Sequence, residues 1–211
     1  MPLYVGVWKA AILAVEYLIR LKQTNKNMLG SSLLELGCGL GVPGMIWKQL
    51  LLQEQKIMGS CDNNGRVVLT DRDSLITQLE TNIENNFHVN DNIIASPLDW
   101  STDGIQKLLL QNNEINDNPL TFDICLNCDC IYEPLYGRQS WESLADVLIE
   151  IAKQSPTTLL VTSVERRNQD NVEGFLTKLK GSGVIGKIDC VITDNTDPHH
   201  IIEIYVTKGI E

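Results

Sequence analysis

One stretch near the amino terminus decides how this chain folds: Ser32-Leu-Leu-Glu-Leu-Gly-Cys-Gly-Leu-Gly-Val-Pro-Gly44. The apolar residues up to Leu36 have the length and composition of a buried strand, and a glycine-rich segment follows at once. Glycine suits a tight turn that needs positive φ angles, and it lets a ligand approach the backbone. Pro43 fits the first turn of a helix, which we expect to continue over 45–52. A nucleotide-like ligand is therefore expected over this turn.

The spacing of the glycines distinguishes two kinds of nucleotide site. They stand at Gly37, Gly39 and Gly41, whereas the dinucleotide fingerprint is Gly-x-Gly-x-x-Gly. The pattern resembles the adenosylmethionine-binding turn of Rossmann-like methyltransferases. That resemblance implies that Glu35 helps to fix the loop and that the backbone amides of the turn, including that of Cys38, face the methionine part of the cofactor. The turn alone leaves other nucleotide-binding folds open.

The composition is that of a soluble globular protein, since 43% of the 211 residues are hydrophobic and 21% are charged. We expect a single domain over residues 1–211. No apolar run is long enough to span a bilayer, and the opening residues lack the basic-then-apolar layout of a signal peptide. These features predict a cytoplasmic or nuclear location and no membrane partner.

The formal net charge of −10 argues against a nucleic-acid partner, because affinity for phosphates needs clustered Lys and Arg. An acidic chain suits a basic protein partner, although the charge could equally serve only solubility. We expect a protein substrate, no nucleic acid and a monomer.

The cysteines do not have the spacing of a disulfide scaffold, and most stand inside apolar runs as reduced core residues would. The run Cys125-x-x-Cys128-x-Cys130 raises the question of zinc. A closed zinc site needs four ligands, and no second Cys or His pair stands nearby at ligand spacing. We therefore expect no metal.

Helix-period and strand-like segments alternate along the rest of the chain. Helices are expected at 7–21, 45–52, 74–86, 102–110, 138–153 and 169–180. Strands are expected at 32–36, 66–71, 92–95, 122–128, 157–164, 184–193 and 200–208. Polar loops are expected at 53–65 and 112–119. In the first helix, one apolar face is expected to contain Trp8, Ala11, Ile12, Val15, Leu18 and Ile19.

This order predicts an α/β fold with a Rossmann-like, seven-stranded, mostly parallel sheet, helices on both faces and a C-terminal antiparallel strand. Ligands of such sheets bind at the carboxyl ends of the strands. We therefore expect the site just after Leu36, Thr70, Ala95 and Asn127.

Several segments at these strand ends resemble the family 16 protein-lysine methyltransferases of the methyltransferase-like 21 type. The segments are Val7-Trp-Lys-Ala-Ala11, Leu34-Glu-Leu-Gly-Cys-Gly-Leu-Gly41, Leu69-Thr-Asp-Arg72, Leu98-Asp-Trp100, Cys128-Asp-Cys-Ile-Tyr132 and Val164-Glu-Arg-Arg167. They cover almost the whole chain in the family's order, and Asp-x-x-Tyr is the most specific of them. The resemblance implies a seven-stranded enzyme that uses S-adenosylmethionine, releases S-adenosylhomocysteine and modifies a cytosolic protein such as a chaperone or translation factor.

The resemblance also implies a set of cofactor-binding residues: Trp8, Glu35, Gly37, Cys38, Gly39, Gly41, Asp71, Arg72, Asp99, Trp100 and Cys128. Asp71 ends a strand where a ribose would lie, and a carboxylate accepts hydrogen bonds from sugar hydroxyls. Trp100 would pack near the adenine, with Asp99 accepting from its exocyclic amine, and Cys128 would present its backbone and a small side chain. Simpler roles stay open, namely a polar strand cap for Asp71 and core packing for Trp100 and Trp8.

Asp129 and Tyr132 are the catalytic candidates. Methyl transfer is an in-line displacement, so the enzyme must align an amine with the methyl group and exclude water. Asp129 would guide the lysine ammonium and Tyr132 would narrow its channel, although a helix N-cap is a structural alternative for Asp129. Glu165-Arg-Arg167 would place mixed charge near the substrate mouth or form a solvated surface run, and His200, with its preceding histidine, is expected only to end a strand.

The predicted function is a protein-lysine N-methyltransferase. The same cofactor site would serve another acceptor, such as a small amine, a histidine or a protein N-terminus. A catalytically idle protein-binding module of the same fold is a third alternative. A nicotinamide-dependent oxidoreductase fits the glycine spacing poorly.

Overall fold

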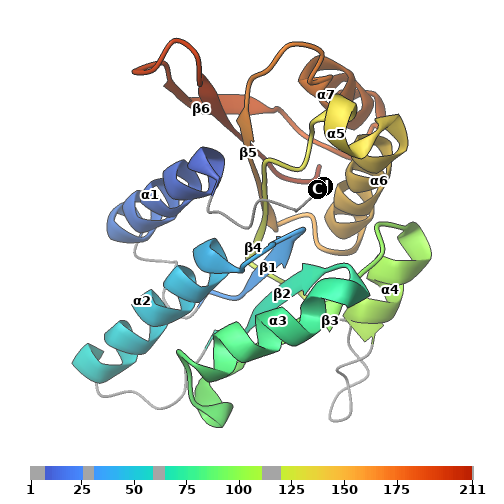
Figure 1. The fold of residues 1–211 in the computed structure, drawn as a ribbon. Helices are drawn as coiled ribbons and strands as arrows, with labels where there is room; N and C mark the ends of the chain where they lie inside the picture. Colours follow the sequence, from blue (N-terminus) through green and yellow to red (C-terminus); the bar gives the residue numbers. More distant parts are fainter. Residues whose placement is uncertain (1–7, 26–30, 59–64, 111–119, 211) are drawn as a thin grey trace.

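The computed structural model of the protein describes residues 8–25, 31–58, 65–110 and 120–210. Its centre is a seven-stranded sheet with the strand order β3-β2-β1-β4-β5-β7-β6 (Figure 1). The strands are β1 Leu33–Leu36, β2 Val67–Asp71, β3 Ile93–Pro97, β4 Ile124–Cys128, β5 Leu159–Glu165, β6 Asp189–Asp194 and β7 Ile202–Thr207. β7 is antiparallel to β5 and β6, and the other paired strands are parallel. The predicted mostly parallel sheet with a C-terminal antiparallel strand is confirmed.

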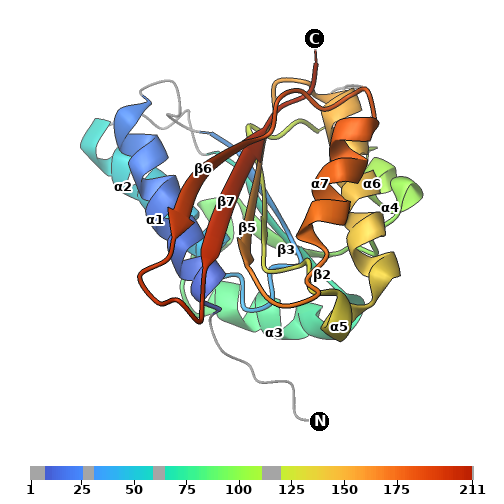
Figure 2. The same ribbon diagram turned by 90° about the horizontal axis from the view of Figure 1, so that it is seen from above.

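Helices cover both faces of the sheet (Figure 2). They are α1 Lys9–Thr24, α2 Val42–Met58, α3 Asp73–Glu84, α4 Thr102–Leu110, α5 Glu133–Tyr136, α6 Arg138–Gln154 and α7 Val172–Gly181, with a short 3₁₀ helix, η2, over Val89–Asp91. α1, α2 and α3 pack into one apolar core, and α4, α6 and α7 pack into a second core on the opposite face. Every residue of β1 and β5 is buried, as expected for strands covered on both sides.

The strand register places the carboxyl ends of the parallel strands side by side. Leu36, the last residue of β1, is paired with Thr70 of β2 and Asn127 of β4. Thr70 is paired in turn with Ser96 of β3. The residues that follow these positions therefore leave the sheet at one edge, which is where the sequence predicts the site.

The predicted loop over 53–65 is wrong in its first part, because α2 continues to Met58. The segment from Gln53 to Lys56 contains no glycine or proline, so its polarity marks the exposed side of a helix and not a break in it. Glu54 lies 2.7 Å from the Lys22 ammonium of α1, which ties the two helices together. The predicted loop residues 59–64 and 112–119 lie outside the described residues.

The predicted apolar face of the first helix is also partly wrong. Trp8 is the N-cap of α1 and is 44% exposed, and Ile12 is 52% exposed. The buried side consists of Ala10, Ala11, Leu13, Ala14 and Leu18. Alanines bring the helix close to the sheet, and the Ser163 hydroxyl of β5 donates to the Ala10 carbonyl at 2.7 Å. Small side chains therefore decide which face is buried here.

Two short elements have no counterpart among the predictions: α5 spans four residues and η2 spans three, which is too short for a hydrophobic period to appear. Within the described ranges, no helix is long and apolar enough to cross a bilayer.

Candidate functional site

The turn between β1 and α2 has the conformation that its glycines predict. Gly37, Gly39 and Gly41 have φ angles of 63°, 55° and 75°. A Cβ atom on Gly37 would lie 2.8 Å from the Trp100 ring and 2.9 Å from the Cys130 sulfur, so both conformation and space require glycine there. A Cβ on Gly39 would meet nothing within 4 Å. The turn is therefore tightly packed at its start and open at Gly39, where a ligand can reach the backbone.

Glu35 anchors this turn from inside the protein. Its side chain is buried, and Oε2 accepts a hydrogen bond from the Gly44 N–H in the first turn of α2 at 2.9 Å. Burial raises the pKa of Glu35 to about 8, although the Gly44 hydrogen bond opposes the shift. The Thr70 hydroxyl donates to the Glu35 carbonyl at 2.7 Å. Glu35 thus fixes the strand, the turn and the helix relative to one another.

Asp71 connects the end of β2 to the same turn. Oδ2 accepts from the Gly39 N–H and Oδ1 from the Arg72 N–H, both at 2.8 Å. Each carboxylate oxygen has a second lone pair, so the half-buried Asp71 side chain retains acceptors for sugar hydroxyls. The Arg72 side chain is exposed, and only its backbone N–H takes part in this contact.

The loop after β3 completes this region. The Leu98 N–H donates to the Asp71 carbonyl at 2.9 Å, which places Asp99 and Trp100 beside the end of β2. Trp100 is half-buried against the core under α4 and α6 and touches Gly37, so core packing and a ligand-facing edge are both features of this ring. The Asp99 side chain is exposed and makes no hydrogen bond within the described part of the chain.

These residues form the first of two groups at the strand ends, here named the glycine-turn cluster: Glu35, Gly37, Gly39, Gly41, Asp71, Asp99 and Trp100. It offers carboxylate acceptors, an open stretch of backbone and an aromatic ring at one edge. This set of groups fits an adenosyl ligand, whose sugar and amine donate hydrogen bonds and whose base stacks.

The cysteines of the site are neutral thiols. Burial raises the pKa values of Cys38 and Cys128 well above their ordinary range, and nearby carboxylates add to the shift. Cys128 is half-buried at the end of β4, and the Cys38 N–H donates to the Thr70 carbonyl at 3.0 Å. Among the described residues, no group of three or more His, Cys, Asp or Glu side chains is arranged to hold a metal ion.

Asp129 is a buried carboxylate just after the end of β4. It is 5% exposed, its φ is 55°, and its N–H donates to the Ser163 carbonyl at 2.7 Å. Both carboxylate oxygens accept from the Arg167 guanidinium, at 2.8 and 2.7 Å, and Oδ1 also accepts from the Glu165 N–H at 3.2 Å. The N-cap alternative for Asp129 is wrong, because the N-cap of α5 is Tyr132 and carries no side-chain cap.

Arg167 gathers further groups around this carboxylate. Its Nη2 lies 2.6 Å from Oε2 of buried Glu165, and His200 Nδ1 lies 2.5 Å from the other oxygen of Glu165. The guanidinium carbon lies 5.0 Å from the centre of the Tyr132 ring and 5.6 Å from that of Trp8. The alternative of a solvated surface run is therefore wrong for Glu165 and Arg167. We name this group the Asp129 cluster: Trp8, Asp129, Tyr132, Glu165, Arg167 and His200.

The structure thus divides the predicted residues between two clusters. Trp8, which the resemblance assigns to the cofactor, lies against Arg167 in the Asp129 cluster, and its exposure corrects the alternative of a core residue. Tyr136 of α5 lies near both clusters: burial raises its pKa to about 12, with Asp129, Arg167 and Arg72 all near enough to act on its charge.

Sequence patterns did not identify Arg167 as the partner of Asp129, nor His200 as a member of the site. A signal for His200 was nevertheless present in the predicted topology. Because β7 runs antiparallel to β5, the residue before β7 lies at the edge where the parallel strands end. The turn between β6 and β7 also lies beside the start of α1, where Lys9 and Asp197 form an ion pair at 3.2 Å (Figure 2).

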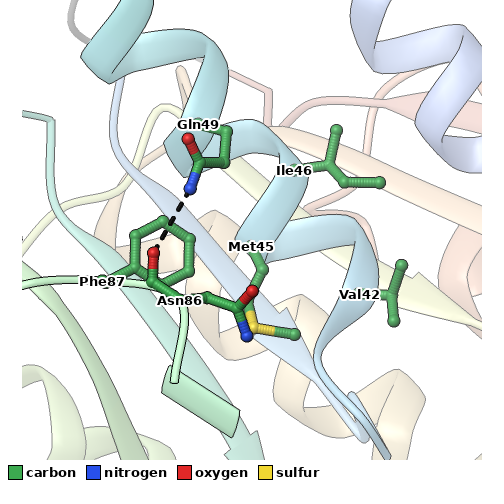
Figure 3. A pocket seen from close by; sticks show the side chains of 6 residues that line it. All are labelled: Val42, Met45, Ile46, Gln49, Asn86 and Phe87. Carbon is green, nitrogen blue, oxygen red and sulfur yellow. Dashed lines mark hydrogen bonds between the residues drawn. The ribbon is translucent and has the colours of Figure 1, made fainter. Parts of the chain in front are cut away.

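A separate pocket lies beside α2. It is lined by Val42, Met45, Ile46, Gln49, Asn86 and Phe87, and the Gln49 amide donates to the Asn86 carbonyl at 3.5 Å across it (Figure 3). None of the predicted site residues lines this pocket, and its walls carry no ionisable side chain. The chemistry-bearing groups are gathered at the strand ends instead.

The sequence of this chain is similar to those of several known proteins. A family model described as lysine methyltransferase matches residues 5–182. The secreted RxLR effector protein 48 of Plasmopara viticola is 33% identical over 144 residues, which are 64% of this chain and 64% of that protein. The protein-lysine N-methyltransferase EFM2 of Saccharomyces cerevisiae is 33% identical over 130 residues, which are 58% of this chain and 28% of that protein. The chain therefore spans less than two thirds of the length of these curated relatives.

Solved structures share the fold at low sequence identity. The O-methyltransferase from Bacillus cereus, in complex with S-adenosylhomocysteine, has a TM-score of 0.59 and 15% identity, and the match covers 98% of this chain and 84% of that one. The N-terminal domain of human METTL16, also in complex with S-adenosylhomocysteine, has a TM-score of 0.59 and 16% identity, covering 100% of this chain and 75% of that one. These likenesses show a methyltransferase fold, and the extent of the family match shows that the chain belongs to the lysine methyltransferase family, which uses S-adenosylmethionine.

Proposed function

We propose that this protein transfers methyl groups from S-adenosylmethionine to a lysine of a cytosolic protein, such as a chaperone or a translation factor. The observation that carries the proposal is the meeting of two unlike clusters at one sheet edge. The glycine-turn cluster offers acceptors and an aromatic ring for an adenosyl group, and the Asp129 cluster offers carboxylates and aromatic rings for a cation. The yeast relative EFM2, described as a protein-lysine N-methyltransferase, supports a protein acceptor.

S-adenosylmethionine would supply a sulfonium-bound methyl group, to which an uncharged amine bonds as the carbon–sulfur bond breaks and S-adenosylhomocysteine leaves. In the proposed site, Asp71 holds the sugar, Asp99 and Trp100 hold the base, and the open backbone at Gly39 borders the methionine part. The N–H groups of Cys38, Gly39 and Gly41 are bonded within the protein, which corrects the expectation that the turn's amides face the cofactor. The backbone and small side chain of Cys128 would border the same ligand. Glu35 acts indirectly, by fixing the turn to the first turn of α2.

The acceptor lysine arrives as an ammonium, whose ordinary pKa is about 10.4, so it has to be guided, aligned and deprotonated. The Asp129 cluster contains two carboxylates and one arginine, and this acidic balance attracts a cation. In the proposal, Asp129 guides the ammonium and the Tyr132 ring narrows its channel, with the proton passing to water or transiently to Asp129. The net charge of −10 suits a protein acceptor better than a nucleic acid.

Labelling tests this proposal. The purified protein is incubated with tritiated S-adenosylmethionine and a dialysed cytosolic extract of Saccharomyces cerevisiae, and labelled proteins are identified by mass spectrometry. We expect methyl groups on lysine side chains of one or a few proteins. Label on histidine, on a protein N-terminus or only on small amines would overturn the lysine assignment, and absence of any label would favour the idle binding module.

Thermal melting tests the cofactor separately from the acceptor. A ligand at one hundred times its dissociation constant stabilises a folded protein by about 2.7 kcal/mol. S-adenosylhomocysteine should produce such a shift, whereas NAD should not. The reverse result would contradict a methyltransferase site and revive the dinucleotide alternative.

A further inference from the structure

We propose that Arg167 is the positioning residue of the acceptor site, an internal cation that fixes the Asp129 carboxylate and the Tyr132 and Trp8 rings for methyl transfer. The inference rests on the proposed function and goes beyond it. Arg167 acts in this scheme through its neighbours, because its side-chain hydrogen bonds in the described part of the chain go to Asp129 and Glu165.

Two adjacent arginines after β5 have opposite surroundings, which shows that charge alone does not explain Arg167. Arg166 bonds to Asp170, Glu173, Glu203 and Tyr205, on the side of α7 and β7. Arg167 turns instead to the strand ends and bonds Asp129 with both terminal nitrogens. Arg166 therefore provides a matched control, with the same charge, the neighbouring position in the chain and no side-chain hydrogen bond to the Asp129 cluster within the described residues.

The geometry at Asp129 requires a guanidinium and not merely a positive charge. Two parallel N–H···O contacts, at 2.8 and 2.7 Å, set the plane of the carboxylate, whereas an ammonium is a point charge and sets none. The same planar group lies over the Tyr132 ring at 5.0 Å and the Trp8 ring at 5.6 Å. One side chain thus orients one carboxylate and two aromatic walls.

Arg167 also bridges two buried carboxylates. The side chains of Asp129 and Glu165 are 4% and 8% exposed, and both bind the guanidinium. His200, which binds the far oxygen of Glu165, is partly exposed and makes no hydrogen bond or ion pair to Asp129 within the described residues. Arg167 is therefore the cation that contacts both carboxylates.

This arrangement also limits how the acceptor binds. Arg167 takes one direction at each oxygen of Asp129, and the Glu165 N–H takes a second direction at Oδ1. An incoming ammonium therefore meets a carboxylate that is already oriented and keeps an acceptor direction at Oδ2. Loss of Arg167 should therefore disturb the alignment of the amine and leave the glycine-turn cluster unchanged. Misplacement by about 1 Å in such a site costs on the order of 100-fold in rate.

The test compares Arg167→Ala and Arg167→Lys with the control Arg166→Lys in the extract-labelling assay, with binding of S-adenosylhomocysteine measured by calorimetry. We expect lysine labelling by Arg167→Ala to fall by about 100-fold, and by Arg167→Lys by about tenfold because the fork is lost while the charge stays. Affinity for S-adenosylhomocysteine should stay within about twofold of the parent in all three, since the glycine-turn cluster is untouched. Arg166→Lys should label at the parent rate.

Chemical rescue separates positioning from general folding support. Ethylguanidinium at millimolar concentration should restore part of the labelling by Arg167→Ala, whereas ethylammonium should not. If Arg167→Ala does not fold, as judged by circular dichroism, Arg167→Lys decides the matter. Parent-level labelling by the folded Arg167 variants, or equal rescue by both cations, would overturn the inference and leave the proposed function intact. A parent protein that labels no lysine would overturn the proposed function itself.

Discussion

The two clusters at the strand ends are built in different ways. The glycine-turn cluster comes from three neighbouring strands, and backbone groups make most of its contacts, such as the Gly39 N–H to Asp71 and the Gly44 N–H to Glu35. The Asp129 cluster is made of side chains from four separate segments, which meet only because β4, β5 and β7 lie side by side in that order and α1 lies across them. The comparison teaches that a backbone-built site follows from local sequence, whereas a side-chain-built site depends on the tertiary fold.

The largest effect should come from a substitution at Asp129, which should lower the rate of methyl transfer and leave cofactor affinity unchanged. Asp129→Asn keeps the size of the side chain but removes the charge that Arg167 and the acceptor ammonium share. We expect methyl transfer to fall by about 100-fold or more, as is usual when a group that guides or deprotonates a reactant is lost. Affinity for S-adenosylhomocysteine, measured by calorimetry, should not change. A folded variant with the parent rate would remove Asp129 from the mechanism.

Gly37→Ala tests the packed start of the turn, and here the effect should fall on folding. Alanine at this position would have to adopt φ near 63°, which is unfavourable for a residue with a Cβ atom. That Cβ would also lie less than 3 Å from the Trp100 ring and the Cys130 sulfur. We expect a loss of about 2 kcal/mol in the free energy of unfolding, measured by urea denaturation. Gly39→Ala is the control for the clash, because Gly39 has a similar positive φ of 55° but its Cβ would meet nothing within 4 Å. Gly39→Ala should mainly weaken cofactor binding and should lower the free energy of unfolding less than Gly37→Ala does. Equal losses of stability in the two variants would contradict an open turn at Gly39.

Asp71→Ala should weaken the cofactor without slowing the chemistry. Its carboxylate binds a ligand sugar equally in the ground and transition states, so its loss raises KM for S-adenosylmethionine and leaves kcat nearly unchanged. We expect a rise of about tenfold in the Kd for S-adenosylhomocysteine, the value for one lost charged hydrogen-bond acceptor. Unchanged affinity would show that Asp71 serves only to cap β2 and hold the Gly39 N–H.

Measured over a single pH unit, the smallest effect is the dependence of stability on pH that Glu35 should cause. Burial raises the pKa of Glu35 from 4.5 to about 8, so between these values the folded protein holds a proton that the unfolded chain has released. This contribution to stability is complete below pH 4.5 and is lost as the pH rises towards 8. From pH 6 to 7 the loss should be about 1 kcal/mol, and Glu35→Gln should abolish it. A parent and variant with parallel stability profiles would contradict the raised pKa.

The same contrast explains what the sequence could and could not predict. The alternation of strands and helices, the turn at Gly37 and the strand-end position of Asp71 follow from local spacing, and each is confirmed in the structure. The pairing of Asp129 with Arg167 could not be read from spacing, because it depends on how β4 and β5 align and on which of two adjacent arginines turns inward. The buried face of α1 was missed for a related reason, since packing against the sheet favoured alanines over Ile12.

The pairing of β1 with β4 affects the order in which parts of the protein fold during synthesis. The first three strands are consecutive along the chain, and β4 to β7 form a second consecutive set, but the two sets meet through contacts such as Ser32 to Asp123, which are 91 residues apart. Loop-closure entropy makes such distant pairing slow compared with pairing inside each set. The glycine-turn cluster belongs to the first set, and Asp129 to the second. The Asp129 cluster also contains Trp8 of the amino-terminal segment, so it needs both sets. We therefore expect the glycine-turn cluster to form first on a chain leaving the ribosome, and the Asp129 cluster to be completed only when β1 pairs with β4.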